Sequence, residues 1–175
     1  MKNIVLTGYM ASGKTTIGSA LANNMGYRFI DVDKLIVEHE KKTINDIFDS
    51  MGEKYFREIE TQVIEKISDT ENAVIATGGG VVLKKINMDT LRKNGIIFFI
   101  DTPIDTIIKR LSRSNTGRPL VDNVGAEQIR ERYERRQKYY NNYDYRIETQ
   151  NKTLGMIINE IKNTYTQAID KLGKD

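Results

Sequence analysis

The sequence predicts an α/β domain built on a parallel sheet, from the order and the type of its apolar segments. Five short apolar runs have the length of strands, at residues 4–6, 29–32, 73–76, 96–100 and, more weakly, 145–149. The first four are almost continuously apolar, as expected for strands buried on both faces. Segments with helical periodicity separate them. Strands that alternate with helices in this way form right-handed crossovers in a parallel sheet.

The helical segments are recognised by apolar residues that share one face. Such residues recur at helical spacing from 17 to 25 and from 59 to 67. Thr43 and Asp46 resemble the two ends of a capping box, which predicts a helix that runs through about residue 48. The last segment, residues 154–172, has the pattern of a terminal amphipathic helix.

Composition limits the class of protein. A chain of 175 residues, 39% hydrophobic and 29% charged, is typical of one globular domain, which we expect to span residues 1–175. It contains no cysteine, which excludes disulfides and thiolate metal sites. The most basic segment, residues 130–138, interleaves acidic with basic residues, unlike the single-sign stripe of a nucleic-acid binder. No apolar stretch is long enough to cross a bilayer, so we expect a cytoplasmic protein with neither a nucleic-acid nor a membrane partner.

The strongest motif is a phosphate-binding loop, or P-loop, at residues 8–15. Its sequence, Gly-Tyr-Met-Ala-Ser-Gly-Lys-Thr, fits G-x-x-x-x-G-K-[ST], follows the first strand and opens the first helix, as such a loop requires. Backbone N–H groups and the positive end of the helix would bind nucleotide phosphates. Lys14 would reach the β- and γ-phosphates, and the Thr15 hydroxyl would ligate Mg²⁺. The nucleotide-binding residues predicted here are Ala11, Ser12, Gly13, Lys14, Thr15 and Thr16.

Two aspartates close the second predicted strand. Residues two apart on an extended chain face the same way, so Asp31 and Asp33 can both face the P-loop. One could hold Mg²⁺ through water, and the other could accept the proton of an acceptor hydroxyl. Alternatively, Asp33 simply caps a helix that begins at Lys34, and the motif by itself favours neither interpretation.

Three later motifs each allow a structural and a functional interpretation. Arg57 and Glu60 can pair on one helical face, as a surface ion pair or as an arginine fork aimed at a substrate carboxylate. The three glycines 78–80 after the third strand indicate a closely approaching ligand or backbone, or only a turn. Residues 112–125 have loop composition and predict a mobile lid; Arg118 in it is either a phosphate-binding residue or an ordinary loop arginine.

In this order, the motifs resemble those of the shikimate kinase family over nearly the whole chain. The family pattern is a P-loop, Asp-x-Asp, Phe-Arg-x-x-Glu, three glycines, Arg-Pro-Leu, and an arginine four residues before a tyrosine. The corresponding segments are residues 8–15, 31–33, 56–60, 78–80, 118–120 and 135–139. The resemblance implies a three-layer P-loop NTPase fold with a five-stranded parallel sheet. It also implies transfer of the ATP γ-phosphoryl group to the 3-hydroxyl of shikimate, a step toward chorismate and aromatic amino acids.

The resemblance also implies roles for individual residues. The shikimate contacts would be Asp33, Arg57, Gly79 and Arg135, in an acceptor-binding region at about residues 33–60. The residues that serve phosphates and Mg²⁺ would be Lys14, Thr15, Asp31 and Arg118. Catalysis would depend on Lys14, Asp33 and Arg118, and Lys152 would face the adenine. With ATP and shikimate as its only partners, we expect a monomer.

Some questions stay open in the sequence. Arg135 and Arg136 are followed by the pair Tyr139 and Tyr140, so the register of the last motif is ambiguous. We choose Arg135 because it aligns the following strand without a gap. An adenine-side arginine, at 110 or 113, is not assigned. The competing functions are a gluconate or nucleoside monophosphate kinase and, from another class, a nucleotide-dependent regulatory or nucleic-acid-binding module.

Overall fold

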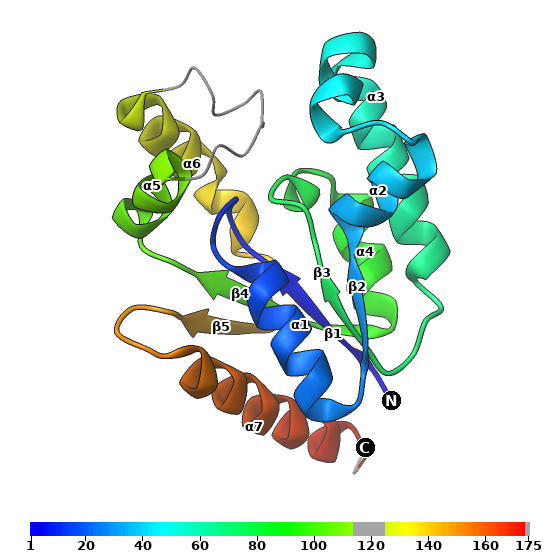
Figure 1. Ribbon diagram of the computed structural model, residues 1–175. Coiled ribbons are helices and arrows are strands. Elements are labelled where there is room, and N and C mark those ends of the chain that lie inside the picture. Colours follow the sequence, from blue (N-terminus) through cyan, green and yellow to red (C-terminus); the bar gives the residue numbers. More distant parts are fainter. Residues whose placement is uncertain (114–124, 174–175) are drawn as a thin grey trace.

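The computed structural model of the protein describes residues 1–113 and 125–173. These residues contain five strands, β1 (Asn3–Thr7), β2 (Arg28–Asp31), β3 (Ala73–Ala76), β4 (Gly95–Asp101) and β5 (Tyr145–Glu148). The strands form one parallel sheet in the order β2-β3-β1-β4-β5 (Figure 1). Every residue of β1 and β3 is buried, because helices cover both faces. The predicted parallel α/β architecture is therefore confirmed.

Helices pack on both faces of the sheet and make a three-layer domain. One face is covered by α1 (Lys14–Met25) and α7 (Leu154–Leu172), which enclose one apolar cluster with residues of β1, β3, β4 and β5. A second cluster lies on the opposite face. That face is covered by α2 (Val32–Glu40), α3 (Ile44–Ile67), the 3₁₀ helix η1 (Val81–Leu83), α4 (Lys85–Lys93), α5 (Ile104–Arg113) and α6 (Ala126–Tyr140).

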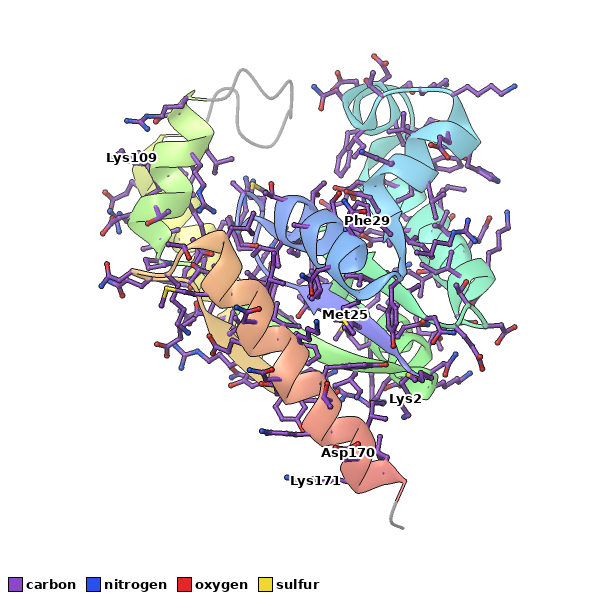
Figure 2. All side chains as sticks on the ribbon, turned by 60° about the horizontal axis from the view of Figure 1, so that its bottom comes forward. Lys2, Met25, Phe29, Lys109, Asp170 and Lys171 are labelled. Carbon is purple, nitrogen blue, oxygen red and sulfur yellow. The ribbon has the colours of Figure 1, made fainter. Side chains whose placement is uncertain are left out.

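The helix that follows the P-loop packs unusually close to the sheet. α1 begins after Gly13 and ends before Gly26, and both glycines have the left-handed backbone that favours glycine. In the middle of the helix, a Cβ added to Gly18 would lie 2.7 Å from a ring carbon of Phe29. Figure 2 shows Met25 at the end of α1 and Phe29 beside this helix, whereas Lys109 on α5 and Lys171 on α7 point outward.

α3 contains both the helix that the capping box predicts and the segment with helical periodicity from 59 to 67. It runs from 44 to 67 as two arms that meet at a kink at Gly52 (φ 80°, ψ 169°), so the first arm extends beyond the predicted end at about residue 48. The capping box is confirmed, since the Asp46 N–H donates to the Thr43 hydroxyl at 3.1 Å and the Thr43 N–H donates to the Asp46 carboxylate at 3.2 Å. The kink allows both arms of α3 to line one pocket.

Within the two described ranges, no helix is long and apolar enough to span a bilayer.

Candidate active site

The P-loop connects β1 to α1 and encloses the Lys14 ammonium group. Gly8 lies so close to β4 that a Cβ there would be 2.7 Å from the Ile100 carbonyl oxygen. The buried Lys14 Nζ donates to the carbonyl oxygens of Gly8 and Tyr9, both at 2.8 Å, and contacts Ser12 Oγ at 3.3 Å. The loop thus holds a fixed positive charge beside the N-terminus of a helix, which is the arrangement that binds phosphate.

The first aspartate of the Asp-x-Asp motif lies beside the P-loop. The Thr15 hydroxyl donates to Asp31 Oδ2 at 2.8 Å. A hydroxyl and a carboxylate are hard oxygen donors, and Mg²⁺ commonly takes few protein ligands and completes its shell with water and phosphate. The donor set therefore fits Mg²⁺.

The second aspartate lies on a helix and not in the strand, and it does not cap that helix. The strand ends at Asp31, whose Oδ1 accepts the Lys34 N–H at 3.3 Å and caps α2. The alternative that Asp33 caps this helix is therefore wrong, as is the argument that the two carboxylates share an extended segment. Asp33 lies in the first turn of α2. There it lines two neighbouring pockets, one that contains the P-loop and one that contains Arg57.

The larger pocket is a cleft that extends from the P-loop to the loop after β5. Thr149, Lys152, Leu154 and Ile157 line its far end. Lys152 lies in this cleft, and its ammonium pairs with Glu160 at 2.5 Å. The Arg110 guanidinium also lines the cleft and donates to the Ala11 carbonyl at 2.9 Å. Of the two arginines that the sequence left unassigned, the structure thus brings Arg110 to the P-loop.

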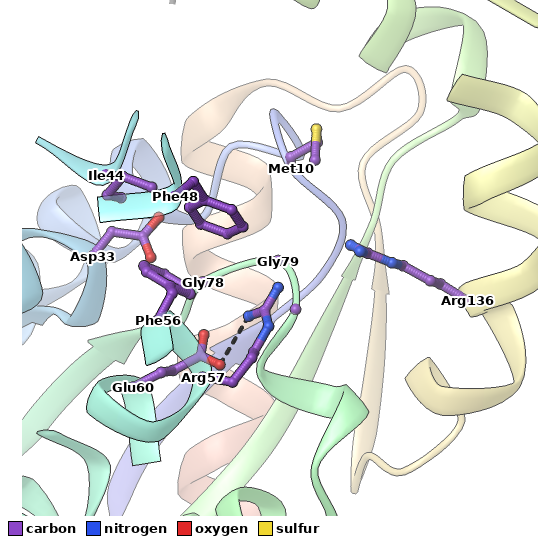
Figure 3. A pocket seen from close by; sticks show the side chains of 11 residues that line it. Met10, Asp33, Ile44, Phe48, Phe56, Arg57, Glu60, Gly78, Gly79 and Arg136 are labelled. Atoms are coloured by element: carbon purple, nitrogen blue, oxygen red, sulfur yellow. Dashed lines mark hydrogen bonds and ion pairs between the residues drawn. The ribbon is translucent and has the colours of Figure 1, made fainter. Parts of the chain in front are cut away.

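The second pocket adjoins the first across Asp33, Gly79 and Met10 (Figure 3). Its charged lining residues include Asp33, Arg57 and Arg136, and Figure 3 shows Asp33 and Arg136 on opposite sides of the pocket. Its apolar lining residues are Met10, Ile44, Phe48 and Phe56. Reasoning from the sequence did not select Met10, Ile44 or Phe48 for the site. The spacing of residues 44 and 48 places them on one face of a helix, but that pattern does not tell which partner the face meets.

The Arg57–Glu60 pair is buried and forms the floor of this pocket. Arg57 Nη1 donates to Glu60 Oε2 at 2.9 Å, and the Glu60 side chain is 0% exposed. Burial raises the pKa of Glu60, and the Arg57 guanidinium opposes that shift. A Cβ added to Gly80 would lie 2.3 Å from Arg57 Nη2, so a larger residue at this position would displace the guanidinium from its present place. The alternative of a surface ion pair is therefore wrong.

The glycine segment lies between the P-loop and α6, and it is more than a turn. A Cβ added to Gly79 would lie 3.0 Å from the Met10 backbone nitrogen. The Tyr140 hydroxyl, from the end of α6, donates to the Gly79 carbonyl oxygen. The close approach of another backbone is one of the two alternatives that the three glycines suggested.

The structure corrects the choice between the two arginines of α6. Arg136 points into the pocket, whereas Arg135 is 77% exposed and pairs with Glu131 on its own helix at 3.0 Å (Figure 3). Residues four apart share a helical face, so Arg136 lies on the side of the buried Tyr140 and Arg135 on the side of the exposed Tyr139. Residues 141–144 form an irregular connection between α6 and β5, so the position of β5 does not fix the register of α6.

Arg118 and residues 114–124 lie outside the described part of the chain. Two residues of the proposed lid, Ser112 and Arg113, belong to α5 and not to a loop. The prediction that Arg118 reaches the phosphates stays a prediction.

A P-loop beside a charged acceptor pocket, on a five-stranded parallel sheet, defines an ATP-dependent P-loop kinase of small molecules. The family model described as shikimate kinase matches residues 10–166. A shikimate kinase of Persephonella marina is 41% identical over 161 residues, which cover 92% of this chain and 97% of the relative. One of Caldicellulosiruptor bescii is 47% identical over 150 residues, covering 85% and 87%. The chain belongs to the shikimate kinase family.

Solved structures of the same family share the fold. The shikimate kinase from Acinetobacter baumannii in complex with shikimate superposes with a TM-score of 0.86 at 31% identity, covering 98% of this chain and 94% of that one. The enzyme from Aquifex aeolicus gives a TM-score of 0.82 at 32% identity, covering 95% and 98%.

Proposed function

We propose that the protein transfers the γ-phosphoryl group of ATP to the 3-hydroxyl of shikimate, on the route to chorismate and aromatic amino acids. The observation that carries the proposal is the pocket beside the P-loop, which Arg57 and Arg136 enter from different helices. A carboxylate that leaves water needs charge-assisted partners, and two guanidinium groups supply them. The apolar residues that line the pocket suit the carbon ring of the acceptor. The structural relative with bound shikimate supports the same assignment.

The residues support a direct transfer. In the proposed step, the 3-hydroxyl oxygen attacks the γ-phosphorus while the bond from that phosphorus to the β–γ bridging oxygen breaks, so shikimate 3-phosphate and ADP form. Asp33, at the junction of the two pockets, accepts the hydroxyl proton. Lys14 neutralises charge on the β- and γ-phosphates, a role that we also propose for Arg118. Mg²⁺, which Thr15 and Asp31 would hold, supplies further neutralisation of the phosphate charge when it is bound.

The remaining assignments belong to the same proposal. Gly79 contacts shikimate through its backbone, Arg136 replaces Arg135 as the second carboxylate partner, and Lys152 lies on the adenine side of the cleft. We also propose a monomer and a cytoplasmic enzyme; the absence of cysteine suits a reducing compartment.

The proposal is tested by measuring ADP release with different acceptors. We expect turnover with shikimate and background rates with gluconate or a nucleoside monophosphate. If turnover were faster with gluconate or a nucleoside monophosphate than with shikimate, that acceptor would be the substrate instead. ATP hydrolysis that is equally fast without any acceptor, together with salt-dependent nucleic-acid binding, would favour the regulatory module instead.

Replacing Arg57 with lysine is expected to raise the KM for shikimate roughly tenfold, with little change in the KM for ATP. Lysine keeps the charge but loses the planar fork that bonds Glu60 and a carboxylate at the same time. Steady-state kinetics with each substrate varied in turn measure both constants. An equal increase in both constants would mean that Arg57 only supports the fold.

The pair Arg136→Ala and Arg135→Ala tests the position of α6. We expect Arg136→Ala to raise the KM for shikimate about 10- to 100-fold, the effect of losing a hydrogen bond to a charged group. Arg135→Ala removes the same charge from the same helix, and we expect less than a twofold change. If the larger effect follows Arg135, our description of this helix face is incorrect.

A further inference from the structure

Two threonines behind the P-loop have no role in the mechanism described above. Thr102 follows β4 and is 1% exposed, and Thr149 follows the neighbouring strand β5. Their hydroxyl oxygens are 2.8 Å apart. The Thr102 hydroxyl also contacts the carbonyl oxygen of Ser12, in the P-loop, at 3.0 Å. The Thr102 side chain therefore contacts the phosphate-binding backbone, and Thr149 contacts Thr102.

The direction of these hydrogen bonds follows from the supply of protons. Each hydroxyl carries one proton, and the Ser12 carbonyl can only accept. Thr102 therefore donates to Ser12. The single proton of the Thr149 hydroxyl has two acceptors within reach, Thr102 Oγ1 at 2.8 Å and the Asp101 carbonyl oxygen at 3.2 Å. The Asp101 carbonyl also accepts the Thr149 N–H at 2.9 Å and so holds Thr149 beside Thr102.

The Ser12 carbonyl matters because it belongs to the same peptide unit as the Gly13 N–H. In a trans peptide the C=O and N–H bonds point in opposite directions, so a carbonyl held on the outside directs the N–H toward the interior of the loop. Gly13 has φ 100°, and glycine resists rotation of its backbone less than any other residue. The neighbouring Ala11 carbonyl is held in the same manner by Arg110. External donors thus fix two carbonyls of the loop.

We propose that Thr102, supported by Thr149, is a positioning residue for the phosphates, because it orients the Gly13 N–H toward them. Thr149 also lines the cleft, so this pair connects the far end of the cleft with the loop that binds the phosphates. The inference rests on the proposed use of ATP but not on the identity of the acceptor.

The test is Thr102→Val, which keeps the shape of the side chain and removes the hydroxyl. We expect the kcat/KM for ATP to fall about 10- to 100-fold, as for one lost hydrogen bond to a charged group, and the Kd for ADP by calorimetry to rise about as much. The Kd for shikimate stays within twofold. Thr102→Ser restores the wild-type values. Thr149→Val raises the Kd for ADP several-fold, less than Thr102→Val, because Thr102 still donates to Ser12.

The matched control is Thr90→Val, which makes the same change at another buried threonine, on α4. Its Kd for ADP is expected to equal that of the wild type. Two results would overturn the inference. One is an unchanged Kd for ADP in Thr102→Val; the other is a Kd for ADP that rises in Thr102→Ser or in Thr90→Val as much as it does in Thr102→Val. If Thr102→Val does not fold, an unchanged Kd in Thr149→Val overturns it instead. If the wild-type protein binds ADP but does not phosphorylate shikimate, only the proposed function is contradicted. The Kd values for ADP of the variants would still test the role of Thr102.

Discussion

Lys14→Ala is expected to lower kcat by about 10³-fold, the size of effect seen when one preorganised charge-stabilising group is removed from an active site. The ammonium is held by two carbonyl oxygens at the entrance of the loop, so it is preorganised for the β- and γ-phosphates. Single-turnover rates at saturating ATP and shikimate measure the loss.

The fold is expected to survive this substitution. Ile17 and Leu21 anchor α1 in the apolar cluster on its face of the sheet, and they do not depend on Lys14. The buried stem and its bonds to the loop do stabilise the loop itself, so we expect a small decrease in Tm with an unchanged circular dichroism spectrum. Near-normal turnover in a folded Lys14→Ala enzyme would disprove the role assigned to the P-loop.

Asp33→Asn is expected to lower kcat by about 10²- to 10⁴-fold, the usual contribution of a general base. Asparagine keeps the size of the side chain and can still form hydrogen bonds to a hydroxyl, but it does not accept the proton. The KM for shikimate is therefore expected to change much less than kcat, and steady-state kinetics separate the two constants.

The control for this variant is Glu38→Gln, which neutralises an exposed carboxylate on the same helix, α2, away from both pockets of the site. We expect its kcat to be within twofold of the wild type. If Asp33→Asn keeps the wild-type kcat and loses only affinity for shikimate, then Asp33 binds the acceptor and another group takes the proton.

Local sequence patterns were sufficient to predict the central features of this protein. The five strands, the parallel sheet and the P-loop all follow from patterns within short windows. An apolar run of four residues can be recognised without knowing its neighbours, and the P-loop is recognised from Gly8 and Gly13, which meet its backbone requirements, and from the charged side chain of Lys14. The order of the later motifs then identified the family, although each motif alone allowed a structural explanation.

The tertiary structure decided which side of each element meets the site. The sequence could not distinguish Arg135 from Arg136, because the answer depends on how α6 packs. Tyr140 stacks on Phe99 of β4, with ring centroids 5.4 Å apart, and this contact turns Arg136 toward the pocket. Similarly, Ile44 and Phe48 line the same pocket as Asp33 because the kink at Gly52 turns the first arm of α3 toward it. Periodicity defines a helical face within one segment, whereas its orientation is set by contacts between residues far apart in the chain.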